Sequence, residues 1–155
     1  MTFKSSVPMV IASCALLAVG IGTPAGDASA QQCNPNTCQV KVTVAGNCSN
    51  AGDITVVPDN LPVPRKHHHL KIHWEIQTSG FKFAPEPNGI TFTTPPLPPA
   101  NEFHSPNATA GGRKYNLTDA NTASTPTDFK YNVQLVRADG SACARKDPFI
   151  RNGAN

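Results

Sequence analysis

The fold is decided by residues 68–77, which read HHLKIHWEIQ. Apolar and polar residues alternate along this run, and successive side chains of a β-strand point to opposite faces. The run therefore predicts a strand with one buried face, formed by Leu70, Ile72, Trp74 and Ile76. Trp74 is the expected anchor of the core, because a large aromatic side chain buries much apolar area.

The same two-residue period recurs in short runs on both sides of this strand. Valines occupy every second position of residues 39–44, and the pattern resumes at residues 53–57 after a turn rich in Gly and Asn, which predicts a hairpin or corner. Residues 95–99, PPLPP, predict an extended connection. We expect a long surface loop over residues 101–127 that is interrupted by one short strand. Further strands are expected at residues 81–83, 90–93, 114–117, 129–136 and 149–150.

No segment keeps apolar residues at helical spacing. The predicted fold class is all-β: a Greek-key, immunoglobulin-like β-sandwich of about seven or eight short strands, stapled by disulfides. The order Cys48, Trp74, Cys143 is similar to the framework of immunoglobulin domains. The gaps of 26 and 69 residues, and the lack of a Tyr two positions before Cys143, depart from that framework. The order thus favours a sandwich over a true immunoglobulin domain.

Residues 1–30 have the layout of a secretory signal peptide. Lys4 precedes a mainly apolar stretch at residues 7–22, and Ala28-Ser29-Ala30 provides the small residues of a cleavage site. Residues 31–155 then form one domain, which is secreted or periplasmic, and no transmembrane segment remains after cleavage.

A lipoprotein signal is the alternative at this end of the chain. Residues 11–14, IASC, are similar to the box at which bacterial lipoproteins are cut and acylated on cysteine. The apolar run continues past Cys14, so the box lies inside the apolar region and not at its end. Cleavage after Ala30 is therefore the favoured interpretation.

Four cysteines follow the signal peptide: Cys33, Cys38, Cys48 and Cys143. An even number in a chain bound for an oxidising compartment indicates two disulfides. Four cysteines allow three connectivities, and the sequence leaves all three open. The preferred pairing joins Cys33 to Cys38 across a short loop and Cys48 to Cys143 across the domain.

Residues 65–73, RKHHHLKIH, are the densest cluster of metal-ligating and charged side chains. His67 and His69 lie about 6.6 Å apart on an extended chain, which permits a shared Zn(II) or Cu(II) ion. His73 joins them only if the chain bends or if another segment, such as the one bearing His104, folds over. The candidate metal ligands are thus His67, His69 and His73.

A basic, solvated patch at the start of an edge strand is the other interpretation of this cluster. Two basic residues followed by three histidines attract an anionic polymer, and the attraction strengthens as the pH falls. The net charge of +3, from 13 basic and 10 acidic residues, names no partner by itself. No aromatic side chain of the patch is expected at the surface, so we expect no specific nucleic acid.

Catalytic motifs are missing from the sequence. Neither Gly-x-Ser-x-Gly nor His-Glu-x-x-His occurs, and after residue 30 the only glutamates are Glu75, Glu86 and Glu102. A blue-copper site needs a His shortly after a free Cys, whereas Cys143 is followed by ARKDP. We therefore expect no enzyme, and no cofactor beyond the Zn(II) or Cu(II) ion considered above.

Five short runs carry a family resemblance: Ile72-His73-Trp74-Glu75-Ile76, Phe81-Lys82-Phe83, Gly89-Ile90-Thr91-Phe92, Phe129-Lys130-Tyr131 and Asp147-Pro148-Phe149-Ile150-Arg151-Asn152. Together they resemble a group of small exported proteobacterial proteins of unassigned function. This resemblance covers most of residues 69–152 and implies export and a β-sandwich, but it implies no catalytic residue.

These observations favour an exported, non-enzymatic binding or envelope-associated module with an unknown ligand. Its partner is expected to be an anionic envelope polymer or another exported protein. The alternative is a periplasmic metal-binding protein that uses the cluster from His67 to His69.

Overall fold

The computed structural model describes residues 33–154. The predicted signal peptide, its cleavage after Ala30 and the lipoprotein alternative at Cys14 lie outside the described residues. Within the described range, no helix is long and apolar enough to cross a membrane. The elements run in the order β1 (Cys33–Asn34), β2 (Thr37–Val44), the 3-10 helix η2 (Ala51–Asp53), β3 (Ile54–Val57), β4 (Asn60–Pro64), β5 (Leu70–Ile76), β6 (Phe81–Phe83), β7 (Ile90–Thr91), β8 (Phe103–Thr109), the 3-10 helix η3 (Ala110–Gly112), β9 (Lys114–Asp119), β10 (Thr127–Lys130), β11 (Asn132–Val133), β12 (Leu135–Arg137) and β13 (Phe149–Ala154).

The larger sheet is built around β5, the strand predicted from residues 68–77. Its order is β1-β2-β5-β9-β8, with β3 paired to β2. β5 pairs in parallel with β2 and antiparallel with β9. The inward face of β5 is confirmed, because Leu70, Ile72, Trp74 and Ile76 are all completely buried. The predicted hairpin of β2 and β3 is also present as an antiparallel pair.

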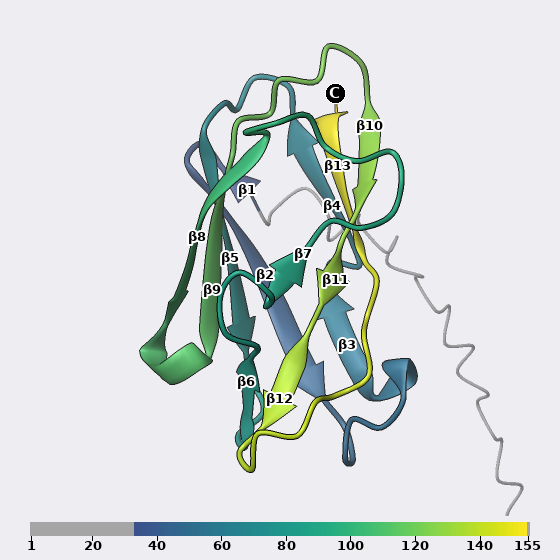
Figure 1. Ribbon diagram of the computed structural model, residues 1–155. Coiled ribbons are helices and arrows are strands. Elements are labelled where there is room, and N and C mark those ends of the chain that lie inside the picture. Colours follow the sequence, from purple (N-terminus) through teal and green to yellow (C-terminus); the bar gives the residue numbers. More distant parts are fainter. Residues whose placement is uncertain (1–32, 155) are drawn as a thin grey trace, which may run out of the picture.

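The opposite layer consists of three small sheets, β10-β13-β4, β11-β7 and β12-β6. In Figure 1, β10, β11 and β12 follow one another down one side of the molecule. The single strand expected at residues 129–136 is therefore wrong, since these three segments pair with three different partners. Local periodicity reports which face is buried and carries no information on the partner strand. The expected face is confirmed, and its members are Phe129, Tyr131, Val133 and Leu135.

The surface loop expected at residues 101–127 is wrong in its first part, where β8 forms, whereas the short strand expected at residues 114–117 is confirmed as part of β9. Two strands, β8 and β9, form an antiparallel pair there, and β8 is the outermost strand of the larger sheet. β8 carries Pro106, and its register shifts between His104 and Asn107. An edge strand needs hydrogen bonds on one side only, so it tolerates Pro and polar residues that do not show apolar alternation.

The all-β class is confirmed. Within residues 33–154, thirteen strand segments replace the seven or eight expected, because several long runs are broken into pieces of two to four residues. The sheets are mixed, with β2 parallel to β5 and β4 parallel to β13. An immunoglobulin sandwich is antiparallel, so these two parallel pairs depart from the expected Greek-key arrangement.

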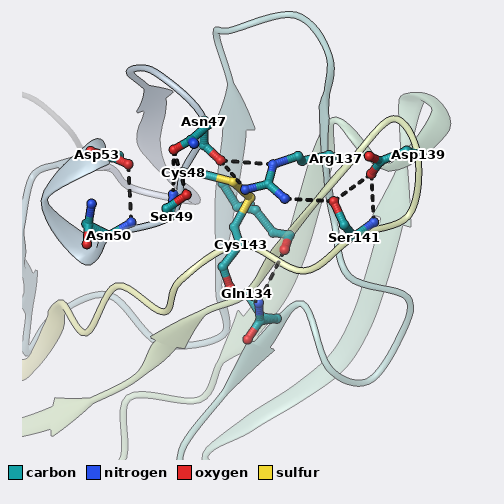
Figure 2. The surroundings of a disulfide bond; sticks show 11 residues. Asn47, Cys48, Ser49, Asn50, Asp53, Gln134, Arg137, Asp139, Ser141 and Cys143 are labelled. Carbon is teal, nitrogen blue, oxygen red and sulfur yellow. Dashed lines mark hydrogen bonds between the residues drawn. A yellow bond between two sulfur atoms is a disulfide. The ribbon is translucent and has the colours of Figure 1, made fainter.

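Two disulfides join Cys33 to Cys38 and Cys48 to Cys143, the pairing preferred from the sequence. The second links the turn after β2 to the segment after β12, which lie 95 residues apart in the chain. Figure 2 shows Arg137 reinforcing this link: its Nε donates to the carbonyl of Asn47 at 2.9 Å and its Nη1 to Ser141 Oγ at 2.8 Å. The two layers are therefore tied together covalently at one end.

Candidate ligand-binding face

The outer face of β2, β5, β9 and β8 in the larger sheet is a regular array of polar side chains, and exposed Val57 of the neighbouring β3 lies beside Lys41. The register of β2, β5, β9 and β8 aligns their outward residues in three rows of four. We call these twelve residues the polar face; it contains no apolar residue. The rows are Thr37, Lys71, Thr118 and His104; Gln39, His73, Asn116 and Asn107; and Lys41, Glu75, Lys114 and Thr109.

His73 and Asn116 form the centre of the polar face. The imidazole Nδ1 of His73 lies within hydrogen-bonding distance of Asn116 Oδ1. Asn116 Nδ2 in turn donates to the carbonyl of Asn107 at 3.2 Å. Since Nδ1 donates to the amide oxygen, the neutral imidazole keeps Nε2 as an acceptor. Hydrogen bonds thus fix the orientations of the His73 and Asn116 side chains, and the backbone of β8 supplies the last acceptor.

Two shallow hollows adjoin on this face. One, of about 310 Å³, lies between Gln39 and Lys114, and the other, of about 240 Å³, lies beside Lys71. His73 and Asn116 line both of them. The hollows therefore form one polar depression that extends across several strands, in contrast to a closed pocket for a small molecule.

The polar face carries more positive than negative charge. Its one carboxylate, Glu75, pairs with Lys114 at 3.4 Å. Lys41 and Lys71 are exposed and make no ion pair with any residue in the range 33–154. The polar face therefore has a net positive charge, from three lysines and one glutamate.

The histidine cluster does not assemble into a group. The chain turns after β4, where the amide of His67 donates to the carbonyl of Pro64 at 2.9 Å, and His69 has a φ of 53°. The spacing expected for His67 and His69 assumed an extended chain, which this turn replaces. Nowhere in residues 33–154 do three or more His, Cys, Asp or Glu side chains lie close enough together to hold a metal ion.

The histidines make separate contacts. His68 Nδ1 lies 3.2 Å from the carbonyl oxygen of Asn121, whereas His73 contacts Asn116 on the polar face. Asn121 also holds the loop of residues 65–69, because its Nδ2 donates to the carbonyls of Pro64 at 2.9 Å and His67 at 2.8 Å. The basic loop is therefore fixed next to the start of β5 by a buried amide.

A buried polar cluster escaped the sequence analysis. Glu102 and Asp119 are 2% and 0% exposed, and the side-chain amide of Asn152 donates to both carboxylates, at 2.7 Å and 2.9 Å. Burial raises the pKa of Asp119 to about 7, against the hydrogen bonds from Asn152 and Asn121, while the charge of Glu102 raises it further. The two-residue period of β9 could have indicated a buried Asp119, because Asp119 lies on the same inward side of the strand as Tyr115.

No model of a known protein family matches the chain, and no curated protein matches it either. The resemblance to small exported proteobacterial proteins stays a prediction. A functional assignment consequently rests on the geometry of the polar face and on the location indicated by the disulfides, which are typical of proteins outside the cytoplasm.

Proposed function

We propose that this chain is an exported, non-enzymatic binding module and that its polar face binds an anionic polymer of the cell envelope. The observation that carries this proposal is the pair Lys41 and Lys71, which are exposed, lie on the polar face and have no ion-pair partner among residues 33–154.

A polymer suits this face better than a small ligand. Neighbouring strands lie about 4.8 Å apart and alternate residues along a strand about 6.6 Å apart, so the twelve side chains form an open grid of regularly spaced groups. The depression around His73 is open and shared between strands. A chain with repeating anionic groups can contact several points of such a grid at once, and each contact adds to its affinity.

Export and the finer fold belong to the same proposal. Two disulfides support folding in an oxidising compartment, in agreement with the signal peptide expected at residues 1–30. Two β layers and the staple from Cys48 to Cys143 support an immunoglobulin-like sandwich. The parallel pairs of β2 with β5 and of β4 with β13 make it a variant of that arrangement.

Calorimetric titration with dextran sulfate tests the proposed function. The variant K41Q/K71Q removes the unpaired charges of the polar face, and K130Q/K146Q removes the same charge from lysines that are ion-paired with Asp147 and Asp59. We expect K41Q/K71Q to weaken binding about tenfold, or ~1.4 kcal/mol, and K130Q/K146Q to weaken it much less. Equal losses from both variants, or no binding by the native protein in low salt, would reject the polar face as the binding site.

A further inference from the structure

Asp119 and Asn152 join the two β layers through one observed hydrogen bond. Asp119 ends β9 in the larger sheet, and Asn152 lies in β13 of the opposite layer. Asn152 Nδ2 donates to Asp119 Oδ1 at 2.9 Å, and both side chains are completely buried. A polar contact of this kind is stable only when every buried atom of the pair has a partner.

Two oxygens of this pair lack a partner. Asp119 Oδ2 and Asn152 Oδ1 are both buried and accept no hydrogen bond from any described residue. An ionised carboxylate and an amide oxygen are both acceptors, so they cannot satisfy each other. Leaving both unsatisfied in an apolar interior is costly.

We propose that Asp119 is a neutral carboxylic acid in the folded protein and that its Oδ2–H donates to Asn152 Oδ1. A single proton then gives a hydrogen bond to both unpaired oxygens, Asp119 Oδ2 and Asn152 Oδ1. The acid and the amide are joined by two reciprocal hydrogen bonds. The pair becomes a proton-dependent clip between the layers. This inference is independent of the proposed polymer binding.

The charged groups around the clip agree with this assignment. Glu102 is the one other carboxylate of the buried cluster, and it accepts hydrogen bonds from Asn152 Nδ2 at 2.7 Å and from the amide of Thr122 at 3.0 Å. These hydrogen bonds stabilise the charge of buried Glu102, and that negative charge disfavours a second anion at Asp119.

The other elements packed against Asp119 contribute no charge to it. In the sheet, its register partners are the apolar Leu70 of β5 and Phe103 of β8. The imidazoles of the loop at residues 65–69 are connected to it only through Asn121, whose backbone amide donates to Asp119 Oδ1 at 2.8 Å. The clip thus adjoins the residue that holds the basic loop, so loss of the proton is expected to loosen that loop as well.

Folding must then be linked to proton uptake. Burial raises the pKa of Asp119 from 3.8 to about 7, so between these values the folded state holds a proton that the unfolded state lacks. The stabilisation is complete below the lower value and is lost as the pH rises through the higher one. The unfolding equilibrium constant should increase up to tenfold per pH unit in this window and level off above it.

Urea unfolding between pH 4.5 and 8.5 tests the clip with two matched variants. In Asp119→Asn, an N–H replaces the proposed O–H, so this variant should keep the clip at every pH and lose the dependence attributed to Asp119. At pH 8 it should be more stable than the native protein. Glu102→Gln, an equivalent change at the neighbouring carboxylate, should retain the dependence.

Carbon-13 NMR of the side-chain carboxyl groups supplies a readout that does not depend on variant stability. The Asp119 resonance of the native protein should be that of a neutral acid at pH 5 and should titrate near neutrality. An Asp119 chemical shift that is already that of an ionised carboxylate at pH 5 would overturn the proposal.

Two results of the unfolding experiments would also overturn it. Loss of the pH dependence in Glu102→Gln alone would assign the proton to Glu102. Stabilisation at pH 8 by calcium chloride, reversed by EDTA, would show that the orphan oxygens hold a cation.

Discussion

The indole Nε1 of Trp74 donates a 3.0 Å hydrogen bond to the hydroxyl of Tyr131 inside the core. The two rings meet edge to face with their centroids 5.6 Å apart. Trp74 belongs to the larger sheet, whereas Tyr131 lies between β10 and β11 of the opposite layer. One aromatic pair therefore provides both apolar packing and polar satisfaction where the layers meet.

Replacing either Trp74 or Tyr131 alone should lower the free energy of unfolding by more than replacing the same residue after the other has already been replaced. Tyr131→Phe leaves a buried indole N–H without an acceptor, which is expected to cost about 1–3 kcal/mol. In the double variant with Trp74→Phe, no unpaired donor remains, so the sum of the single losses should exceed the double loss. Urea denaturation of the four proteins measures this coupling. Strictly additive losses would mean that the hydrogen bond contributes nothing specific.

The two disulfides should differ in their effect on stability. The loop closed by Cys48 and Cys143 spans 95 residues, and the one closed by Cys33 and Cys38 spans 5. Chain entropy predicts losses of about 5 and 2 kcal/mol on opening them. Replacing Cys48 and Cys143 together by Ser should consequently lower the melting temperature much more than replacing Cys33 and Cys38. A larger effect from the short loop would contradict the entropic explanation.

Binding of dextran sulfate should strengthen as the pH falls from 8 to 5, because histidine gains positive charge in this interval. Two double variants locate the effect: H73N/H104N on the polar face and H67N/H68N on the basic loop. The first should lose most of the gain, about fivefold if the two new charges together add about 1 kcal/mol. Added salt should reduce the binding of all three proteins. A gain that is lost only in H67N/H68N would move the binding surface to the loop.

Asn121 should be the residue that orders the loop of residues 65–69. Asn121→Ala removes the donors to Pro64 and His67 and also the Oδ1 acceptor of the Gly153 amide. We expect a loss of about 1–3 kcal/mol in unfolding free energy and faster hydrogen exchange of the His67 amide. Exposed Asn107 provides the control: its hydrogen bond to Asn116 uses the backbone carbonyl, so Asn107→Ala should change neither measurement appreciably.

We expect the protein to be exported, with a mature chain that begins at Gln31 and carries two disulfides. Mass spectrometry of the intact protein should show a loss of four hydrogens relative to its reduced form, two for each disulfide. Four free thiols in the exported protein would contradict folding in an oxidising compartment.

Much of the architecture could be predicted because it depends on local alternation. The buried side of β5 and the inward side of residues 129–136 both follow from a two-residue period. The preferred cysteine pairing matches the structure, although spacing alone left three connectivities open. The sequence does not indicate which strands pair with one another. For this reason one predicted strand proved to be three, β10, β11 and β12.

The residues of the polar face and of the buried cluster also divide into those placed by local alternation and those placed by tertiary contacts. The sequence by itself determined that Lys71, His73 and Glu75 share the outer side of one strand, since their spacing places them opposite Trp74. Only the tertiary structure brought Asn116 beside His73, placed Asn121 against the loop of residues 65–69 and placed Asn152 against Asp119. These contacts join residues far apart in the chain, and their energies depend on burial and strand register, which no local pattern encodes.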